Sequence, residues 1–311
     1  ASAKRRGAGI RAGALRAETV ALWKLSARLT ESVHRKGRIV IRLDSSAAWA
    51  LATRLVSANR DVLAAIAGVF FLLPTLAFAI LVPEPQIPAG LPPREMMTLL
   101  GDAYGRAMPF LLLVSVLQIT GTLTVLVVMT AHDRPTVAQA IRRGFVMTGP
   151  YLLAQLLIGL TLGGAFVLFV SLMSLTGVQA LAAAAVLMIF AVMVYCGLRV
   201  MLIAPVIATE NLRNPVAAIR RSWALTRGNT ARIGVFLTLA GLVFFVIYGL
   251  IMMLVGVVLV LTTGGELQRA LGAAVSSAIT SGAMVYLTAM LAAMHHLLSG
   301  PTGPEIIATF E

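Results

Sequence analysis

Two arginine pairs that each stand close to an aromatic residue have the clearest chemistry in this chain. The candidates for contact with a lipid or a partner are Arg142, Arg143, Phe145, Arg220, Arg221, Trp223 and Arg227. A helix with such residues can sink its ring to the acyl boundary of a bilayer while its guanidinium groups reach phosphates by snorkelling. Near an anionic surface, each basic residue contributes on the order of 1 kcal/mol. Recognition of anionic groups is therefore one interpretation of these residues.

The arginine pairs belong to a segment that recurs along the chain. Residues 214–229 read NPVAAIRRSWALTRGN and residues 136–148 read TVAQAIRRGFVMT, so a shift of 78 positions superimposes their arginine pairs. A weaker copy, AAWALATRLVSANRD, occupies residues 47–61. Because long apolar sequence follows each copy, the predicted repeating unit is a short basic amphipathic helix that leads into membrane spans. The predicted repeat units cover about residues 45–130, 134–208 and 212–298.

The third copy carries helix signals at both ends. Asn214 is a good N-cap, and Pro215 suits the first helical position because its missing N–H has no intrahelical partner to lose. Gly228 and Asn229 tolerate the left-handed geometry that ends a helix. The predicted apolar stripe comprises Val216, Ile219 and Trp223. Such a helix either fixes topology and braces the spans, or recognises a lipid or a partner.

The apolar composition predicts an all-α fold in a membrane. The chain is 59% hydrophobic and 12% charged, and a span needs about 20 apolar residues. The predicted spans are 62–82, 107–130, 150–175, 181–208, 231–263 and 271–294. Continuous apolar runs of this kind lack the alternation of a barrel. We expect a polytopic membrane protein with about six transmembrane helices and three cytoplasmic interfacial amphipathic helices in a threefold internal repeat.

The placement of arginine predicts the orientation of the spans. Eight arginines lie in the two connections that hold the second and third copies: Arg134, Arg142, Arg143, Arg213, Arg220, Arg221, Arg227 and Arg232. Three lie on the opposite side: Arg94, Arg106 and Arg269. By the positive-inside rule, the basic helices and both termini are expected to face the cytoplasm.

The net charge of +13 mainly describes the first 42 residues. This segment holds eleven Lys and Arg against Glu18 and Glu31, which gives +9, so nucleic-acid binding does not follow from the charge. The predicted domains are a basic tail at 1–42, one membrane domain at 43–298 and a short tail at 299–311. The basic tail lacks the apolar core of a signal peptide. It is expected to be disordered, with a helix on an anionic leaflet as the alternative.

Four polar residues in or beside the spans are further candidates for function. Arg199 is expected to snorkel to the interface, or to pair with Glu210 across the kink that Pro205 introduces. A charge that faces a substrate is the alternative, because intramembrane charges are costly and often functional. Gln118 and Gln155 are expected to donate hydrogen bonds between helices.

Small residues at helical spacing predict where the spans pack closely. Gly159 and Gly163 form a GxxxG step, and Gly272, Ser276 and Thr280 recur at every fourth position. Both sets are expected to mark contacts within the chain, with an oligomer interface or the wall of a polar cavity as the alternatives.

One stretch of about 25 residues matches a bacterial pattern in which a proline, an acidic residue and an A-L-K-R-S-W-x-L-T-K-G-N helix recur between spans. The matching positions are Pro205, Glu210, Ala218, Arg221, Ser222, Trp223, Leu225, Thr226, Arg227, Gly228 and Asn229. The stretch resembles the membrane domain attached to some glycerophosphoryl diester phosphodiesterases, and it is similar to YciC-like six-helix proteins. The resemblance implies a multi-pass domain of the bacterial inner membrane, and it supplies no catalytic residue.

The sequence offers no constellation for catalysis or for metal binding. HExxH, GxSxG and P-loop motifs are absent, and a phosphodiesterase would need a separate soluble barrel. His295 and His296 point about 100° apart on a helix, so they are not expected to share a metal. Cys196, the single cysteine, excludes an intrachain disulfide and a cysteine metal cluster. No enzymatic activity and no cofactor are expected.

The predicted function is that of an integral inner-membrane scaffold or sensor. Its expected partners are membrane lipids, above all anionic ones, and a membrane-protein partner or a second copy of the chain. The alternatives are a transporter or lipid-translocating protein, which internal repeats and broken helices favour, and an accessory subunit of a membrane complex.

Overall fold

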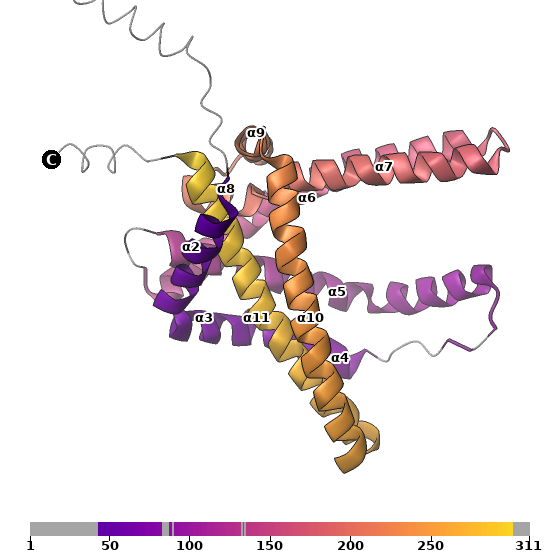
Figure 1. Cartoon of the computed structure of the whole chain (residues 1–311), viewed down its shortest axis with the longest axis horizontal. Helices are drawn as coiled ribbons and strands as arrows, with labels where there is room; N and C mark the ends of the chain where they lie inside the picture. The colour runs from indigo at the N-terminus through magenta and orange to yellow at the C-terminus, as the bar shows by residue number, and fades with distance from the viewer. Residues whose placement is uncertain (1–42, 83–86, 89, 132, 134, 301–311) are drawn as a thin grey trace, which may run out of the picture. The chain divides into compact units, whose positions relative to one another are not determined.

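The structure is a computed structural model that describes residues 43–82, 87, 88, 90–131, 133 and 135–300 (Figure 1). These residues form helices joined by turns, and they contain no strand. The helices are α2 (Ser45–Ala58), α3 (Arg60–Ala67), the π-helix η1 (Gly68–Leu72), α4 (Leu73–Leu81), α5 (Pro93–Thr130), α6 (Val137–Ser174), α7 (Gln179–Val200), α8 (Ile203–Glu210), α9 (Pro215–Thr226), α10 (Thr230–Thr262) and α11 (Gly265–Ser299). The predicted basic tail, 1–42, and nearly all of 299–311 lie outside the described residues.

Six helical stretches are long and apolar enough to cross a membrane, and each overlaps one predicted span. They are Arg60–Leu81, Pro93–Thr130, Val137–Ser174, Ala183–Glu210, Thr230–Thr262 and Gly265–Ser299. The second and third begin well before the predicted residues 107 and 150. The reason is that their helix-start signals lie upstream of the apolar runs. Pro93 occupies the first helical position of α5, and Thr136 forms a capping box with Gln139 at the start of α6.

The second copy of the basic segment is therefore not a separate helix in the structure. Residues 137–148 are the first turns of α6, which continues through Pro150 without a break. The buried face of these turns packs against α5. Gly144 lies so close to α5 that a Cβ at this position would stand 2.9 Å from the backbone nitrogen of Thr124. Thr120 and Thr148 share a hydrogen bond of 3.0 Å across the same contact.

Two of the spans are composite, and a proline accompanies each irregularity. In the first span, the π-helix η1 ends at Leu72, two residues before Pro74, and its wider turn accommodates a residue that lacks an N–H. The fourth span breaks between α7 and α8 at Met201 and Leu202. Met201 lies four residues before Pro205, where the proline ring clashes with the helix carbonyl. The predicted kink at Pro205 is confirmed.

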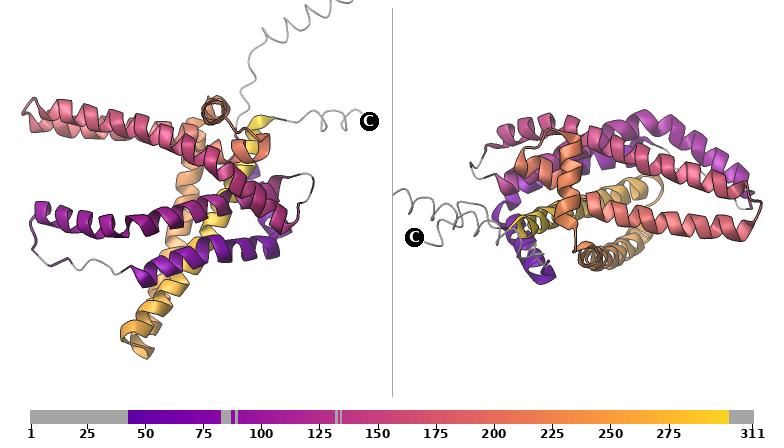
Figure 2. Two further views of the ribbon diagram at one scale, coloured as in Figure 1. Left: turned by 180° about the vertical axis from the view of Figure 1, so that it is seen from behind. Right: turned by 90° about the horizontal axis from the view of Figure 1, so that it is seen from above.

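Three pairs of neighbouring helices make up the spans. The segment α3–η1–α4 packs on α5, α6 contacts α7, and α10 contacts α11 (Figures 1 and 2). Between α10 and α11, the hydroxyls of Tyr248 and Ser276 lie 3.0 Å apart, and Gly272 faces Leu259. The expected contact within the chain is therefore confirmed at Ser276, whereas Gly272 leaves room for a Cβ and both residues line a cavity, which was the alternative.

The GxxxG step on α6 differs from its prediction. Among the described residues, no heavy atom of a neighbouring element lies within 4 Å of a Cβ built on Gly159 or Gly163. The two glycines follow the part of α6 that packs on α5, so this face of the helix is open. The expected contact within the chain is wrong at this step.

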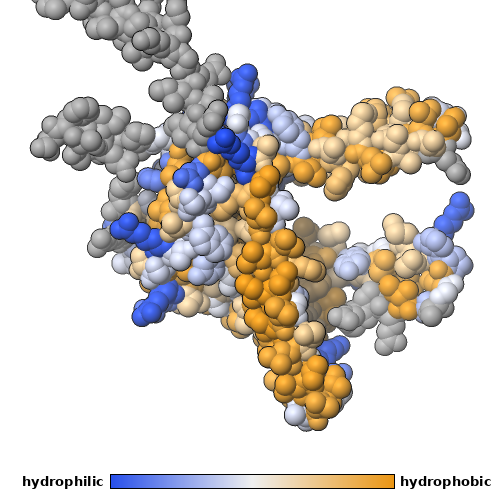
Figure 3. Space-filling model, in the orientation of Figure 1, coloured by the Kyte–Doolittle hydropathy of each residue, from blue (hydrophilic) through white to orange (hydrophobic). Residues whose placement is uncertain are grey.

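Buried side chains are concentrated at the end of the spans that lies beside α2, α8 and α9, which we call the α9 end. The buried residues of α6 fall between Ala140 and Ala154, those of α10 between Ile233 and Ala240, and those of α11 between Ser277 and Leu298. The remaining lengths expose apolar side chains, and Figure 3 shows a hydrophobic band along α10. Such surface is expected where lipid surrounds a helix.

Candidate functional site

Helix α9 runs across other helices at the α9 end (Figure 2), and small residues fix it there. The side-chain oxygen of Asn214 accepts hydrogen bonds from the N–H groups of Val216 and Ala217 at 3.0 and 3.2 Å, which confirms the predicted N-cap. The buried face comprises Ala218, Ser222, Leu225 and Thr226. Of the predicted apolar stripe, Ile219 packs against the core and Trp223 contacts Arg199 and Tyr195, whereas Val216 is 45% exposed.

The last turn of α7 is closed by side chains of α9. Carbonyl groups in the last turn of a helix have no intrahelical partner, and Arg199 lies in this turn. Its carbonyl oxygen accepts hydrogen bonds from the Ser222 hydroxyl at 2.9 Å and from the Thr226 hydroxyl at 3.2 Å. These two bonds satisfy a polar group that the break before Pro205 would otherwise leave exposed to apolar surroundings.

The side chain of Arg199 is buried rather than extended to an interface. It is 5% exposed, and its guanidinium carbon lies 4.5 Å from the ring centroid of Trp223 and 5.7 Å from that of Tyr195. Cation–π contact of this kind stabilises a desolvated guanidinium by about 2 kcal/mol. Its Nε has no hydrogen-bond partner among the described residues. The expected snorkelling of Arg199 is wrong, because Trp223 covers the side chain.

The carboxylate of Glu210 joins three helices at the α9 end. Arg221 Nε donates to its two oxygens at 2.9 and 3.0 Å, and His295 Nε2 lies 3.1 Å from Oε1. Glu210 ends α8, Arg221 lies on α9 and His295 lies on α11. Asn211, at φ 52°, ends α8 in the left-handed conformation and so turns the chain back toward α9. The expected pair of Arg199 with Glu210 is wrong.

The remaining polar predictions have mixed outcomes. Gln118 Nε2 on α5 donates to the Thr75 hydroxyl on α4 at 3.2 Å, which is the expected bond between helices. Gln155 Nε2 donates instead to the Tyr151 hydroxyl on its own helix at 2.7 Å. The expected interhelical role of Gln155 is wrong, because Tyr151 stands one turn away and already supplies an acceptor.

The outward face of α9 carries an exposed basic surface, which we call the α9 surface: Arg220, Trp223 and Arg227. Arg220 and Arg227 have no ion-pair partner within the described part of the chain. Arg221 faces Glu210 instead and therefore does not belong to this surface. On α6, Phe145 is 68% exposed, two positions after Arg143.

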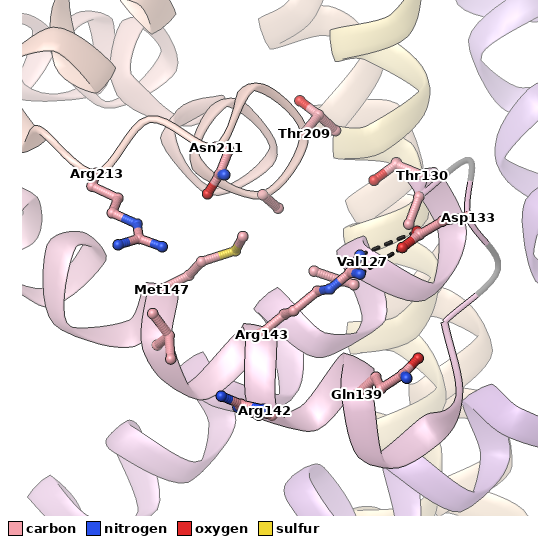
Figure 4. Close-up of a pocket in the computed structure, with 13 residues that line it drawn as sticks. Val127, Thr130, Asp133, Gln139, Arg142, Arg143, Met147, Thr209, Asn211 and Arg213 are labelled. Carbon is pink, nitrogen blue, oxygen red and sulfur yellow. Dashed lines mark hydrogen bonds and ion pairs between the residues drawn. The ribbon is translucent and has the colours of Figure 1, made fainter.

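A second group of arginines surrounds a cavity of about 810 Å³ at the ends of α5, α6 and α8, which we call the basic pocket. Its lining includes Arg142 and Arg143 on α6 and Arg213 in the loop after α8, which are labelled in Figure 4. Asp133 binds Arg143 through both carboxylate oxygens. Arg142 and Arg213 have no ion pair among the described residues.

The basic pocket differs from the cavity at the opposite end of the spans. That cavity, of about 770 Å³, lies between α4, α10 and α11 and holds one charged residue, Arg269, among the described lining residues. Arg269 is paired with Glu266 at 3.5 Å. Among the described residues, arginines without an ion pair gather around a cavity or beside an aromatic ring at the α9 end, in the basic pocket and on the α9 surface. At the other end, Arg94 and Arg106 also have no ion pair among these residues.

Sequence reasoning missed three members of these sites. Arg213 entered only as one of the eight arginines that set the orientation, and Gln139 only as part of a repeated segment. His295 entered only as one of two histidines that are not expected to share a metal, but its side chain is 7% exposed and binds Glu210. The order Thr136-x-x-Gln139 is a readable capping-box signal. Nothing in the sequence signals that residues 85 positions apart, Glu210 and His295, are in contact.

The described residues contain no group of three or more His, Cys, Asp or Glu side chains that could hold a metal ion. Comparison with the known protein families finds no family that matches the chain, and no curated protein and no solved structure matches it either. The functional proposal therefore rests on the residues at the α9 end.

Proposed function

We propose that the chain is a non-enzymatic integral membrane protein that binds anionic lipid at its α9 end. The α9 surface carries this proposal, because Arg220 and Arg227 are exposed beside a partly exposed Trp223 and have no ion pair with any described residue. A helix that lies across the ends of the spans with these residues exposed suits the headgroup region. There the tryptophan ring lies at the acyl boundary and the arginine guanidinium groups reach lipid phosphates. The chain then serves as a scaffold or sensor of the lipid around it.

The finer features of the proposal come from the sequence. The excess of arginine at the α9 end supports a cytoplasmic location for this end. The recurrence of the basic segment supports a threefold repeat of amphipathic helices, each followed by spans. The resemblance to phosphodiesterase-associated membrane domains and YciC-like proteins supports a bacterial inner membrane. In this chain, the residues that carry the resemblance lie on α8, on α9 and in the turn after α9, and Glu210, Arg221, Ser222 and Thr226 among them make the contacts that join these helices to their neighbours.

Lipid retention by the full-length protein tests the proposal. The protein is reconstituted into mixed vesicles of zwitterionic and anionic phospholipid and released gently, and the retained lipid is identified by native mass spectrometry. In the variant Arg220→Ala/Arg227→Ala, the free energy of binding to anionic lipid should weaken by about 2 kcal/mol. This corresponds to a roughly thirtyfold loss of affinity and a lower enrichment of anionic lipid.

A matched control removes the same charge at the other end of the spans. Arg94 and Arg106 are exposed near the start of α5, so Arg94→Ala/Arg106→Ala should leave the enrichment unchanged. Equal retention by the wild type and by both variants would remove the lipid-binding role of the α9 surface. A second protein retained at fixed stoichiometry, with no enrichment of lipid, would replace it with the role of an accessory subunit.

Lipid translocation is the second candidate, and the break between α7 and α8 favours it. Broken spans are typical of transport sites, and Arg199 lies beside this break with an Nε that has no hydrogen-bond partner among the described residues. Fluorescent-lipid flipping in vesicles tests this candidate. Flipping by the wild type that is lost in a folded Arg199→Ala variant would favour translocation, and flipping at the protein-free rate would exclude it.

A further inference from the structure

The basic pocket holds an excess of positive charge. Its described lining residues include Arg142, Arg143 and Arg213 against one carboxylate, that of Asp133. Because Asp133 and Arg143 bind each other through two hydrogen bonds, the ionic partner of Arg143 is already in place. Two guanidinium groups, those of Arg142 and Arg213, face the same cavity without an ion pair among the described residues. Like charges gathered around a cavity repel each other and attract an anion.

The geometry around these two arginines is built from separate elements. Arg142 lies on the second turn of α6, which is fixed on α5 by the contacts of Gly144 and by the bond between Thr120 and Thr148. Arg213 lies three residues after Glu210, whose bonds to Arg221 and His295 fix the end of α8. The two guanidinium groups are therefore carried by elements that are each anchored independently.

The composition of the wall limits the ligand further. Gln139, Thr130 and Asn211 add neutral hydrogen-bonding groups beside the arginines. Val127, Val146 and Met147 add apolar side chains to the wall. A cavity of about 810 Å³ is large enough for a headgroup and its glycerol, since ligand sites usually measure about 300–1,000 Å³.

We infer that the basic pocket binds a phosphate group, with Arg142 and Arg213 as its ligands and Arg143 kept in place by Asp133. Guanidinium forks match phosphate oxygens in pairs, which favours phosphate over a simple halide. The apolar wall beside the site favours a phosphate that is carried by a phospholipid, and this source rests on the proposed function. A soluble phosphate ester has the same chemistry and is the other source that the experiment separates.

Two probes are applied to the full-length protein. For the first, the protein is reconstituted into nanodiscs of phosphatidylcholine with or without phosphatidylglycerol, and tightly retained lipids are counted by native mass spectrometry. For the second, glycerol 3-phosphate and inorganic phosphate are titrated into lipid-depleted protein by calorimetry. The wild type should retain one phosphatidylglycerol per chain, or bind one soluble phosphate, according to the source.

Arginine substitutions then decide whether the basic pocket is the site. In Arg142→Ala/Arg213→Ala, affinity for the bound phosphate should fall at least about tenfold, because charged hydrogen bonds are lost. Arg142→Lys/Arg213→Lys keeps the charge but removes the paired donors, so its affinity for phosphate should lie between that of the wild type and that of the double alanine variant. Both arginines are exposed and unpaired in the described structure, so folding, checked by circular dichroism, should be unaffected.

The α9 variant separates this inference from the proposed function. Arg220→Ala/Arg227→Ala removes equal charge outside the basic pocket, so it should keep the single bound phosphate even where general enrichment of anionic lipid falls. Wild-type retention in Arg142→Ala/Arg213→Ala would overturn the inference, and so would the absence of any bound lipid or phosphate in the wild type. Loss in the pocket variant, with no effect of the α9 variant on enrichment, would support the pocket and contradict the α9 surface.

Discussion

The hydroxyl groups of Ser222 and Thr226 and the ring of Trp223 all act on one residue, Arg199. Two of them satisfy its carbonyl and the third covers its guanidinium. The sequence of α9 suggests a basic helix at a membrane surface. In the structure, however, Ser222, Trp223 and Thr226 contact the end of α7, where the fourth span is broken. The contacts join residues 23 and 27 positions apart, so no local pattern could have predicted them.

The Glu210 carboxylate should be the most sensitive ionic group at the α9 end. Glu210→Gln leaves Arg221 and His295 without the charge that both contact. Because the Glu210 side chain is 26% exposed, we expect a loss of about 1–3 kcal/mol of unfolding free energy, less than for a fully buried pair. Thermal unfolding in detergent measures the change. Glu266→Gln is the control, because its pair with Arg269 is exposed and should contribute little. Equal midpoints for the two variants would contradict this role.

Gly144 should be intolerant of even one methyl group. In Gly144→Ala, the new Cβ would overlap with Thr124 on α5, and the overpacking should cost about 1–3 kcal/mol. Gly159→Ala is the matched control on the same helix, because no described atom of a neighbouring element lies within 4 Å there. Alanine is the better helix former, so the control should keep or raise the unfolding midpoint. A midpoint for Gly144→Ala at the wild-type level would show that α5 and α6 are not in close contact.

At the scale of helices, the sequence predicts the spans well and their ends poorly. Hydropathy alone locates all six spans, since burial in lipid requires the same apolar length whatever the neighbours are. It misplaces the start of α6 because residues 137–148 are polar enough to suggest a surface helix. Their buried face, with Ala140 and Gly144, consists of small residues that hydropathy weighs lightly. Packing on α5, rather than polarity, decides where this segment lies.

The N-cap of α2 gives this helix a dependence on pH. The pKa of Asp44 is lowered from its usual 3.8 by the hydrogen bond from the Ser46 hydroxyl and by backbone N–H groups of Ser46 and Ala47. Because the pKa of Asp44 is lower in the folded state, the ionised cap contributes its full stabilisation at pH values above the unfolded-state pKa. This stabilisation is lost as the pH falls through the folded-state pKa. Asp44→Asn keeps the acceptor without the charge. Its unfolding midpoint should therefore fall less than that of the wild type between pH 5 and about pH 3. The same change of midpoint with pH in the wild type and in Asp44→Asn would contradict a stabilising role for the ionised cap.

At the scale of the whole membrane domain, charge and burial are both concentrated at the same end. The basic pocket, the α9 surface and the buried polar contacts of Arg199 and Glu210 lie there, while the far lengths of α6 and α10 are apolar and exposed. In the proposed function, this charged end meets the lipid headgroups and the apolar lengths meet the acyl chains. The positive-inside rule predicts that the charged end faces the cytoplasm.

Cysteine labelling in intact cells tests that direction. In a Cys196→Ser background, Ala224→Cys places an exposed thiol on α9, and Thr176→Cys places one in the turn between α6 and α7, at the opposite ends of the spans. A membrane-impermeant maleimide added to bacterial cells should label position 176 and leave position 224 unlabelled, and inverted vesicles should give the reverse. Labelling of position 224 from outside would place the arginine-rich end outside the cytoplasm and would contradict the positive-inside orientation. It would also remove the cytoplasmic leaflet, with its anionic lipid, as the surface that the α9 end binds.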